Sequence, residues 1–119
     1  MRWISGLKAR INGALAERKA LVYLQKHGLT LIEKNYSCRV GEIDLIMREA
    51  ETLVFVEVKS RQSDTYGTSV EFVNDNKVSK IKRAIANYFA KKNINPAMIS
   101  YRIDVVGLDE CDVTWIKSI

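Results

Sequence analysis

Apolar and polar residues alternate along the chain with two different periods, one typical of helices and one of strands. Between residues 12 and 26 the apolar side chains recur at helical spacing, with Asn12 as the expected N-cap and Gly28 as the expected stop. Residues 76–92 repeat this spacing and predict a second helix. The apolar positions are Ala14, Ala16, Ala20, Leu21 and Leu24 in the first helix and Val78, Ile81, Ile85, Tyr88 and Phe89 in the second.

Five further segments have the composition of strands: residues 29–36, 42–47, 52–59, 99–105 and a short one at 113–119. The third of these is rich in β-branched residues and apolar on both faces, which predicts a central strand. The resulting order is α-β-β-β-α-β with one extra strand. It predicts an α/β fold with a mixed sheet and helices packed against it.

Length and composition narrow the class of protein. The chain has 119 residues, of which 47% are hydrophobic, so we expect a single packed domain over residues 1–119 with its core at about 12–106. It contains no apolar run of the roughly 20 residues that cross a membrane. The N-terminus lacks the apolar stretch of a signal peptide, so we expect a cytoplasmic protein without a membrane partner.

Charge is distributed unevenly around an acidic centre. Nineteen Lys and Arg residues face fourteen Asp and Glu residues, which gives a net charge of +5. Residues 1–27 and 77–92 each hold six basic residues, whereas 42–57 hold five acids and one Arg. This pattern suits a polyanion held near a bound cation, but ordinary solvated faces explain the charges equally well.

The hairpin of residues 42–47 and 52–59 brings acidic residues together. If its turn is symmetric about residues 50–51, paired positions sum to 101, so Asp44 lies opposite Glu57 and Glu42 opposite Lys59. Residues directly opposite each other share a face, and Lys59 shares that of Glu57. Two facing carboxylates repel each other, so the pair requires a compensating cation.

Two interpretations of this cluster remain open. Lys59 can itself supply the compensating charge, which would make the cluster an exposed salt-linked patch. Alternatively, Asp44 and Glu57 hold Mg²⁺ or Mn²⁺, since such ions prefer oxygen ligands. Lys59 beside the ion would then orient the water that attacks a phosphodiester.

Glu17 is a further candidate for the site. On a helical wheel it lies between Leu21 and Leu24, inside the apolar face of the first helix. A carboxylate on a packing face is costly unless it is paired or bound to a metal. A glutamate at the rim that reaches solvent, or one paired with a strand lysine, is the alternative.

Several of these residues also form a family signature. The run Gly41-Glu-Ile-Asp-Leu-Ile46, followed by Val54-Phe-Val-Glu-Val-Lys59 and Arg61, resembles the bacterial YraN-like family. That family is similar to archaeal Holliday junction resolvases and belongs with the PD-(D/E)xK nuclease superfamily. The resemblance extends from about residue 13 to 106, and it implies a restriction-endonuclease-like core of order αβββαβ.

The resemblance also implies roles for individual residues. Asp44 and Glu57 would be metal ligands, with the backbone carbonyl of Val58 as the third, and Lys59 would be the catalytic lysine. Glu17 would match the acidic residue on the first helix of the resolvase branch. Ile43 stands where the superfamily pattern has proline.

We therefore expect a hydrolase, a Mg²⁺- or Mn²⁺-dependent endonuclease-like protein, with DNA, including branched or junction DNA, as its substrate class. The alternative is a nucleic-acid-binding module that retains the fold without catalysis; a protein-interaction adaptor is a third candidate. The sequence does not give the oligomeric state, so a homodimer stays open. The residues expected to contact phosphates are Arg39, Arg61, Lys77, Lys80 and Lys82.

Overall fold

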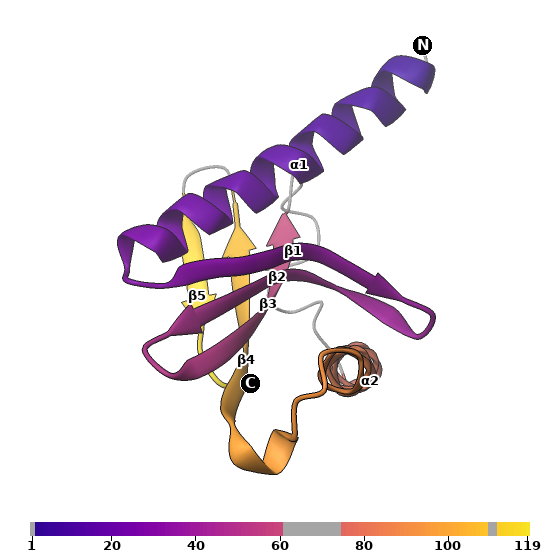
Figure 1. Ribbon diagram of the computed structural model, residues 1–119. Helices are drawn as coiled ribbons and strands as arrows, with labels where there is room; N and C mark the ends of the chain where they lie inside the picture. The colour runs from indigo at the N-terminus through magenta and orange to yellow at the C-terminus, as the bar shows by residue number, and fades with distance from the viewer. Residues whose placement is uncertain (1, 61–74, 110–111) are drawn as a thin grey trace.

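The computed structural model describes residues 2–60, 75–109 and 112–119, with side chains from residue 13 onward. Its elements follow the predicted order (Figure 1). They are α1 (Arg2–Lys26), β1 (Thr30–Cys38), β2 (Gly41–Glu49), β3 (Thr52–Ser60), α2 (Asp75–Lys91), the short 3₁₀ helix η3 (Pro96–Met98), β4 (Ser100–Leu108) and β5 (Val113–Ile116).

The strands form one mixed sheet in the order β1-β2-β3-β4-β5. All neighbouring strands are antiparallel except β3 and β4, which run parallel. Parallel neighbours require a crossover connection, and α2 lies between these two strands in the chain. The predicted αβββαβ core with an extra strand is therefore confirmed.

The two helices cover opposite faces of the sheet (Figure 1). On one face α1 packs its buried residues Ala16, Ala20 and Leu24 against β2, β3 and β4. On the other face α2 packs against an aromatic-rich core that includes Phe55 and Tyr88. Because β3 is covered on both sides, residues 53–57 are all buried, as expected of a central strand.

The first helix is longer than its sequence pattern predicts. It begins at Arg2, so Asn12 lies inside it, and the expected N-cap at Asn12 is wrong. Half of residues 2–11 are good helix formers and none is proline, which allows the helix to continue through them. Its predicted end is confirmed: Gly28 has a φ of 94°, and the amides of Gly28 and Leu29 donate to the carbonyls of Gln25 and Leu24.

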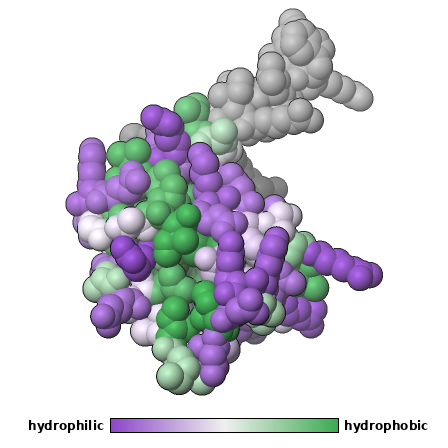
Figure 2. Space-filling model, viewed as in Figure 1, coloured by the Kyte–Doolittle hydropathy of each residue, from purple (hydrophilic) through white to green (hydrophobic). Residues whose placement is uncertain are grey.

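The surface is mainly hydrophilic in the view of Figure 2, with one apolar band running across the middle of the molecule. Among the described residues, no helix combines the length and the apolar character needed to cross a membrane.

Candidate functional site

The first feature of the site is the point where β2 and β3 stop pairing. Their register is as predicted, from Glu49 opposite Thr52 to Leu45 opposite Val56. One residue further on, Asp44 Oδ2 accepts a hydrogen bond of 2.8 Å from the backbone amide of Val58. A side chain thus takes the place of a ladder hydrogen bond and orients the Asp44 carboxylate.

The alternation of side chains between the two faces of the sheet is interrupted in β2 at Asp44. Ile43 packs in the core beneath α2, whereas Leu45 packs in the core beneath α1. In a regular strand, residues two apart would share one face. Opposite this break in β1 lies Asn35, with a φ of 55°, between the pairs Lys34–Leu45 and Tyr36–Ile43. The irregularity sets Asp44 apart from the packed positions around it.

Glu57 follows directly on β3, and its side chain is only 7% exposed. Its Oε1 atom lies 3.4 Å from Lys59 Nζ and 3.1 Å from Lys77 Nζ. Lys59 shares the face of Glu57 because it is two residues further along the strand, as predicted. Lys77 comes from the first turn of α2. Two ammonium groups from different elements therefore meet at one buried carboxylate.

The electrostatics of Asp44 follow from this crowding. Burial and the neighbouring charge of Glu57 raise the pKa of Asp44 from 3.8 to about 7, with Glu17 and Glu42 adding to the effect. The hydrogen bond from Val58 opposes the rise but does not cancel it. Partial burial by itself would lower the pKa of Lys77, but the contact with Glu57 outweighs it and raises that pKa. Burial and the nearby carboxylates thus both disfavour the charged form of Asp44 in the absence of a cation.

Glu17 lies beside this cluster at a half-buried position on α1. Burial and the charge of Glu42 raise its pKa, whereas Lys34 and a hydrogen bond with Asn35 oppose the rise. It lines a hollow of about 410 Å³ between α1 and the first strands, together with Lys34, Asn35 and Leu45. The predicted proximity of Glu17 to the acidic strands is therefore seen, and its predicted alternative partner, a strand lysine, is also at hand.

A groove of about 400 Å³ runs between α2 and the β1–β2 turn on the Lys77 side of the cluster. Its lining includes three cations, Arg39, Lys77 and Lys80, and the carboxylate of Glu42. Gly41 allows the helix to come this close, because a Cβ atom there would lie 3.3 Å from the backbone oxygen of Lys80. The groove is therefore basic and leads to Glu57 through Lys77.

The remaining predicted residues have different outcomes. Lys82 is exposed on α2 but does not line this groove. Arg61 falls outside the described residues. The β2–β3 pairing ends at Leu45 and Val56, so neither predicted pair beyond it, Asp44 with Glu57 or Glu42 with Lys59, is formed as a strand pair. Asp44 nevertheless lies close enough to Glu57 to feel its charge. Glu42 pairs with Ser37 of β1.

The oxygen donors suit a hard divalent cation. In the described part of the chain, no three His, Cys, Asp or Glu side chains converge as a complete metal site. Asp44 and Glu57 offer two carboxylates, and Mg²⁺ commonly binds one or two carboxylates while keeping several waters. The amide of Val58 points toward Asp44. In an extended strand the N–H and C=O of a residue point to the same side, so the Val58 carbonyl faces this cluster too. This donor set fits Mg²⁺ or Mn²⁺.

The contact of Lys77 with Glu57 is one that the sequence did not predict. Lys77 was expected only as a phosphate-binding residue, and its contact depends on how α2 lies along the sheet. The run of six basic residues over 77–92, which begins at Lys77, was the signal in the sequence.

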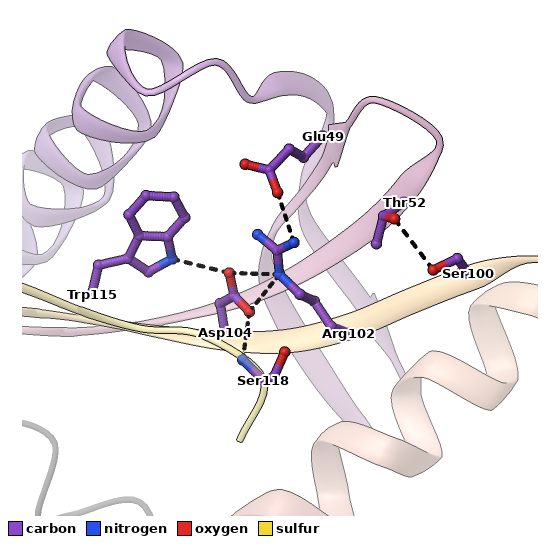
Figure 3. Close-up of polar contacts among 7 residues, drawn as sticks. All are labelled: Glu49, Thr52, Ser100, Arg102, Asp104, Trp115 and Ser118. Atoms are coloured by element: carbon purple, nitrogen blue, oxygen red, sulfur yellow. Dashed lines mark hydrogen bonds and ion pairs between the residues drawn. The ribbon is translucent and has the colours of Figure 1, made fainter.

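A second group of buried polar residues lies around β4 (Figure 3). Asp104 is fully buried and accepts hydrogen bonds from Arg102 Nε, Trp115 Nε1 and the amide of Ser118, at 3.0 to 3.2 Å. Arg102 also donates from Nη1 to Glu49 at 2.8 Å. Nothing in the sequence analysis singled out these residues. Every oxygen of this carboxylate has donors, which is typical of a structural network.

The site and fold together define an α/β protein with a carboxylate–lysine cluster at the end of a central strand. Comparison with known proteins identifies the family to which it belongs. The profile of the uncharacterised protein family UPF0102 matches residues 16–108, and the chain belongs to this family.

Curated relatives match along most of their lengths. A UPF0102 protein of Cupriavidus metallidurans is 44% identical over 107 residues, covering 89% of this chain and 78% of its own. A UPF0102 protein of Legionella pneumophila is 43% identical over 108 residues, covering 89% and 91%. One from Photobacterium profundum is 42% identical over 114 residues, covering 94% and 91%. The predicted YraN-like membership is confirmed.

Proposed function

We propose that this protein is a divalent-metal-dependent endonuclease that hydrolyses phosphodiester bonds of DNA, with branched or junction DNA among its substrates. One observation carries the proposal: Asp44 and Glu57 come together at the end of a buried strand, with Lys59 and Lys77 on Glu57. The raised pKa of Asp44 supports it, because strongly shifted carboxylates that are buried beside other acidic groups cluster at functional sites.

The side chains have distinct roles in this proposal. Asp44, oriented by the Val58 amide, and Glu57 would hold Mg²⁺ or Mn²⁺ together with the Val58 carbonyl. The bound ion would polarise the scissile phosphate and stabilise the charge that develops on it. Lys59, partly exposed beside Glu57, would orient the attacking water and offset negative charge. Glu17 is a further acidic group at the edge of the same site.

The substrate would be held mainly through its phosphates. Arg39, Lys77 and Lys80 line one groove next to the acidic cluster. Contacts of this kind fix the position of a nucleic acid without reading its sequence. This favours recognition of DNA shape over recognition of bases.

A second candidate is a DNA-binding module without catalysis. The observation that favours it is the neutralisation of Glu57 by two lysines, which makes the cluster partly self-compensating. Both functions use the basic groove, and they differ only in the chemical step.

A cleavage assay separates the two candidates. Purified protein is incubated with linear, forked and four-way DNA in Mg²⁺, Mn²⁺ or EDTA. The nuclease proposal predicts metal-dependent cleavage that Asp44→Ala, Glu57→Ala and Lys59→Ala each abolish, while Lys82→Ala, a matched exposed change, cuts like the parent. Binding without cleavage of any of these DNAs would favour the binding module. Cleavage by all three site variants at the parent rate would show that the site is elsewhere.

If the groove between α2 and the β1–β2 turn binds phosphates, DNA binding should depend on salt. Binding to DNA should weaken with salt by about 0.9 in log K per log salt unit for each phosphate neutralised. Lys80→Ala should flatten that slope by about one unit, because Lys80 lines the groove, and Lys82→Ala should not. Equal slopes for the two variants would exclude the groove as the phosphate-binding surface.

A further inference from the structure

Two lysines contact the same oxygen of Glu57, and they differ in the element they come from and in their exposure to solvent. Lys59 belongs to the same strand, two residues away, and its side chain is 25% exposed. Lys77 reaches Glu57 from α2 with a side chain that is 39% exposed. Lys77 also lines the basic groove with Arg39 and Lys80. It is thus the lysine that connects the acidic cluster to the groove.

A divalent cation cannot join this arrangement without a change. Like charges within a few ångströms of each other repel, and Glu57 Oε1 already has two ammonium neighbours at 3.1 and 3.4 Å. A metal ion on Glu57 would therefore favour the withdrawal of one of them. Lys77 is the more exposed of the two and lines the adjacent groove, so its four-carbon stem has a second position within reach.

We propose that Lys77 acts as a built-in counter-cation: it occupies the cation position on Glu57 in the metal-free protein and transfers to a phosphate of the nucleic acid when a divalent cation binds. This inference rests on the proposed function and assigns Lys77 a positioning role beyond general phosphate contact. Lys77 thereby couples metal binding to DNA binding.

The first test measures Mn²⁺ binding without DNA, by the electron paramagnetic resonance signal of free Mn²⁺. Lys77→Met removes the competing ammonium and should bind Mn²⁺ about three- to tenfold more tightly than the parent. Lys77→Arg keeps a cation and should bind no more tightly than the parent. Lys80→Met, one helical turn further along the same groove, is the matched control and should bind like the parent. Equal Mn²⁺ affinity of Lys77→Met and the parent would overturn the proposal.

The second test measures binding of a short, labelled, uncleavable duplex with Ca²⁺ or with EDTA. Lys77 contacts Glu57 in the metal-free protein, so Lys77→Met should reduce DNA affinity about fivefold or more with Ca²⁺ and by less than about twofold with EDTA. Lys80→Met should reduce it about equally in both conditions. An equal loss for Lys77→Met with and without Ca²⁺ would contradict the transfer.

Melting curves establish that each variant is folded, and Lys77→Gln gives the same comparison if Lys77→Met is not. The outcomes separate this inference from the function on which it rests. A parent that binds Mn²⁺ but is unaffected by loss of Lys77 overturns the counter-cation alone. A parent that binds no Mn²⁺, even with the duplex present, overturns both.

Discussion

Asp44 and Asp104 belong to the same sheet, but the groups that surround their carboxylates differ. Asp104 is fully enclosed, and donors from Arg102, Trp115 and Ser118 surround its carboxylate. Asp44 receives a hydrogen bond from Val58 and faces the acidic side chains of Glu57, Glu17 and Glu42.

The different surroundings of Asp44 and Asp104 suit different roles for the two side chains. A buried charge that serves only stability is best paired and hydrogen-bonded, as Asp104 is. Repelling carboxylates lower stability and persist where function requires them. The acidic surroundings of Asp44 suit the cation site that we propose, whereas the donors around Asp104 suit a carboxylate that stabilises the fold.

The largest effect is expected at Asp104. Asp104→Ala removes the acceptor for Arg102, Trp115 and Ser118 and leaves a half-buried guanidinium without one of its two carboxylate partners. We expect a loss of about 3–5 kcal/mol in the free energy of unfolding, measured by urea denaturation. A loss below about 1 kcal/mol would show that the network contributes little.

A smaller effect of opposite sign is expected at Asp44, and it should depend on pH. The pKa of Asp44 is about 7 in the folded protein and about 3.9 in the unfolded chain, so the folded state binds more protons between these values. Its contribution to stability is complete below about pH 4 and is lost as pH rises through 7.

Asp44→Asn has no such titration. Relative to the parent it should therefore gain stability as pH rises, by up to about 4 kcal/mol at pH 8 without metal, because each unit of pKa difference corresponds to about 1.4 kcal/mol. Urea denaturation of both proteins across this pH range measures the difference. Parallel curves would contradict the raised pKa.

The smallest effect is expected at the outer end of the Asp104 network. Glu49 is 36% exposed and pairs with Arg102, and such pairs contribute little in solvent. Glu49→Gln should lower the free energy of unfolding by about 0.5 kcal/mol. A loss as large as that of Asp104→Ala would mean that the two acids act as one unit.

The sequence predicted what depends on local pattern. Strand order, the β2–β3 register and the end of α1 follow from periodicity, turn symmetry and Gly28. The predicted start of α1 was wrong because a good capping residue, Asn12, lies inside a segment that contains no proline and continues the helix on its N-terminal side. Capping preference alone does not end a helix.

What depends on packing between distant segments could not be predicted. Strand alternation puts Asp104 on the face opposite Ile103, but only the position of Trp115 and the chain end shows that this face is covered. In the same way, periodicity gives the buried face of α2 but not how far the helix lies along the sheet. The contact of Lys77 with Glu57 depends on that position.

We expect the Asp44–Glu57 cluster to bind a divalent cation and the Asp104 network not to bind one. Thermal unfolding of the parent, Asp44→Asn and Asp104→Asn with and without Mn²⁺ tests it most directly. At about ten times its Kd, the ion adds about 1.4 kcal/mol, or about 5 °C in Tm. We predict this shift for the parent and for the less stable Asp104→Asn, and at most a small fraction of it for Asp44→Asn. Equal shifts for the parent and Asp44→Asn, or none in the parent, would contradict the claim.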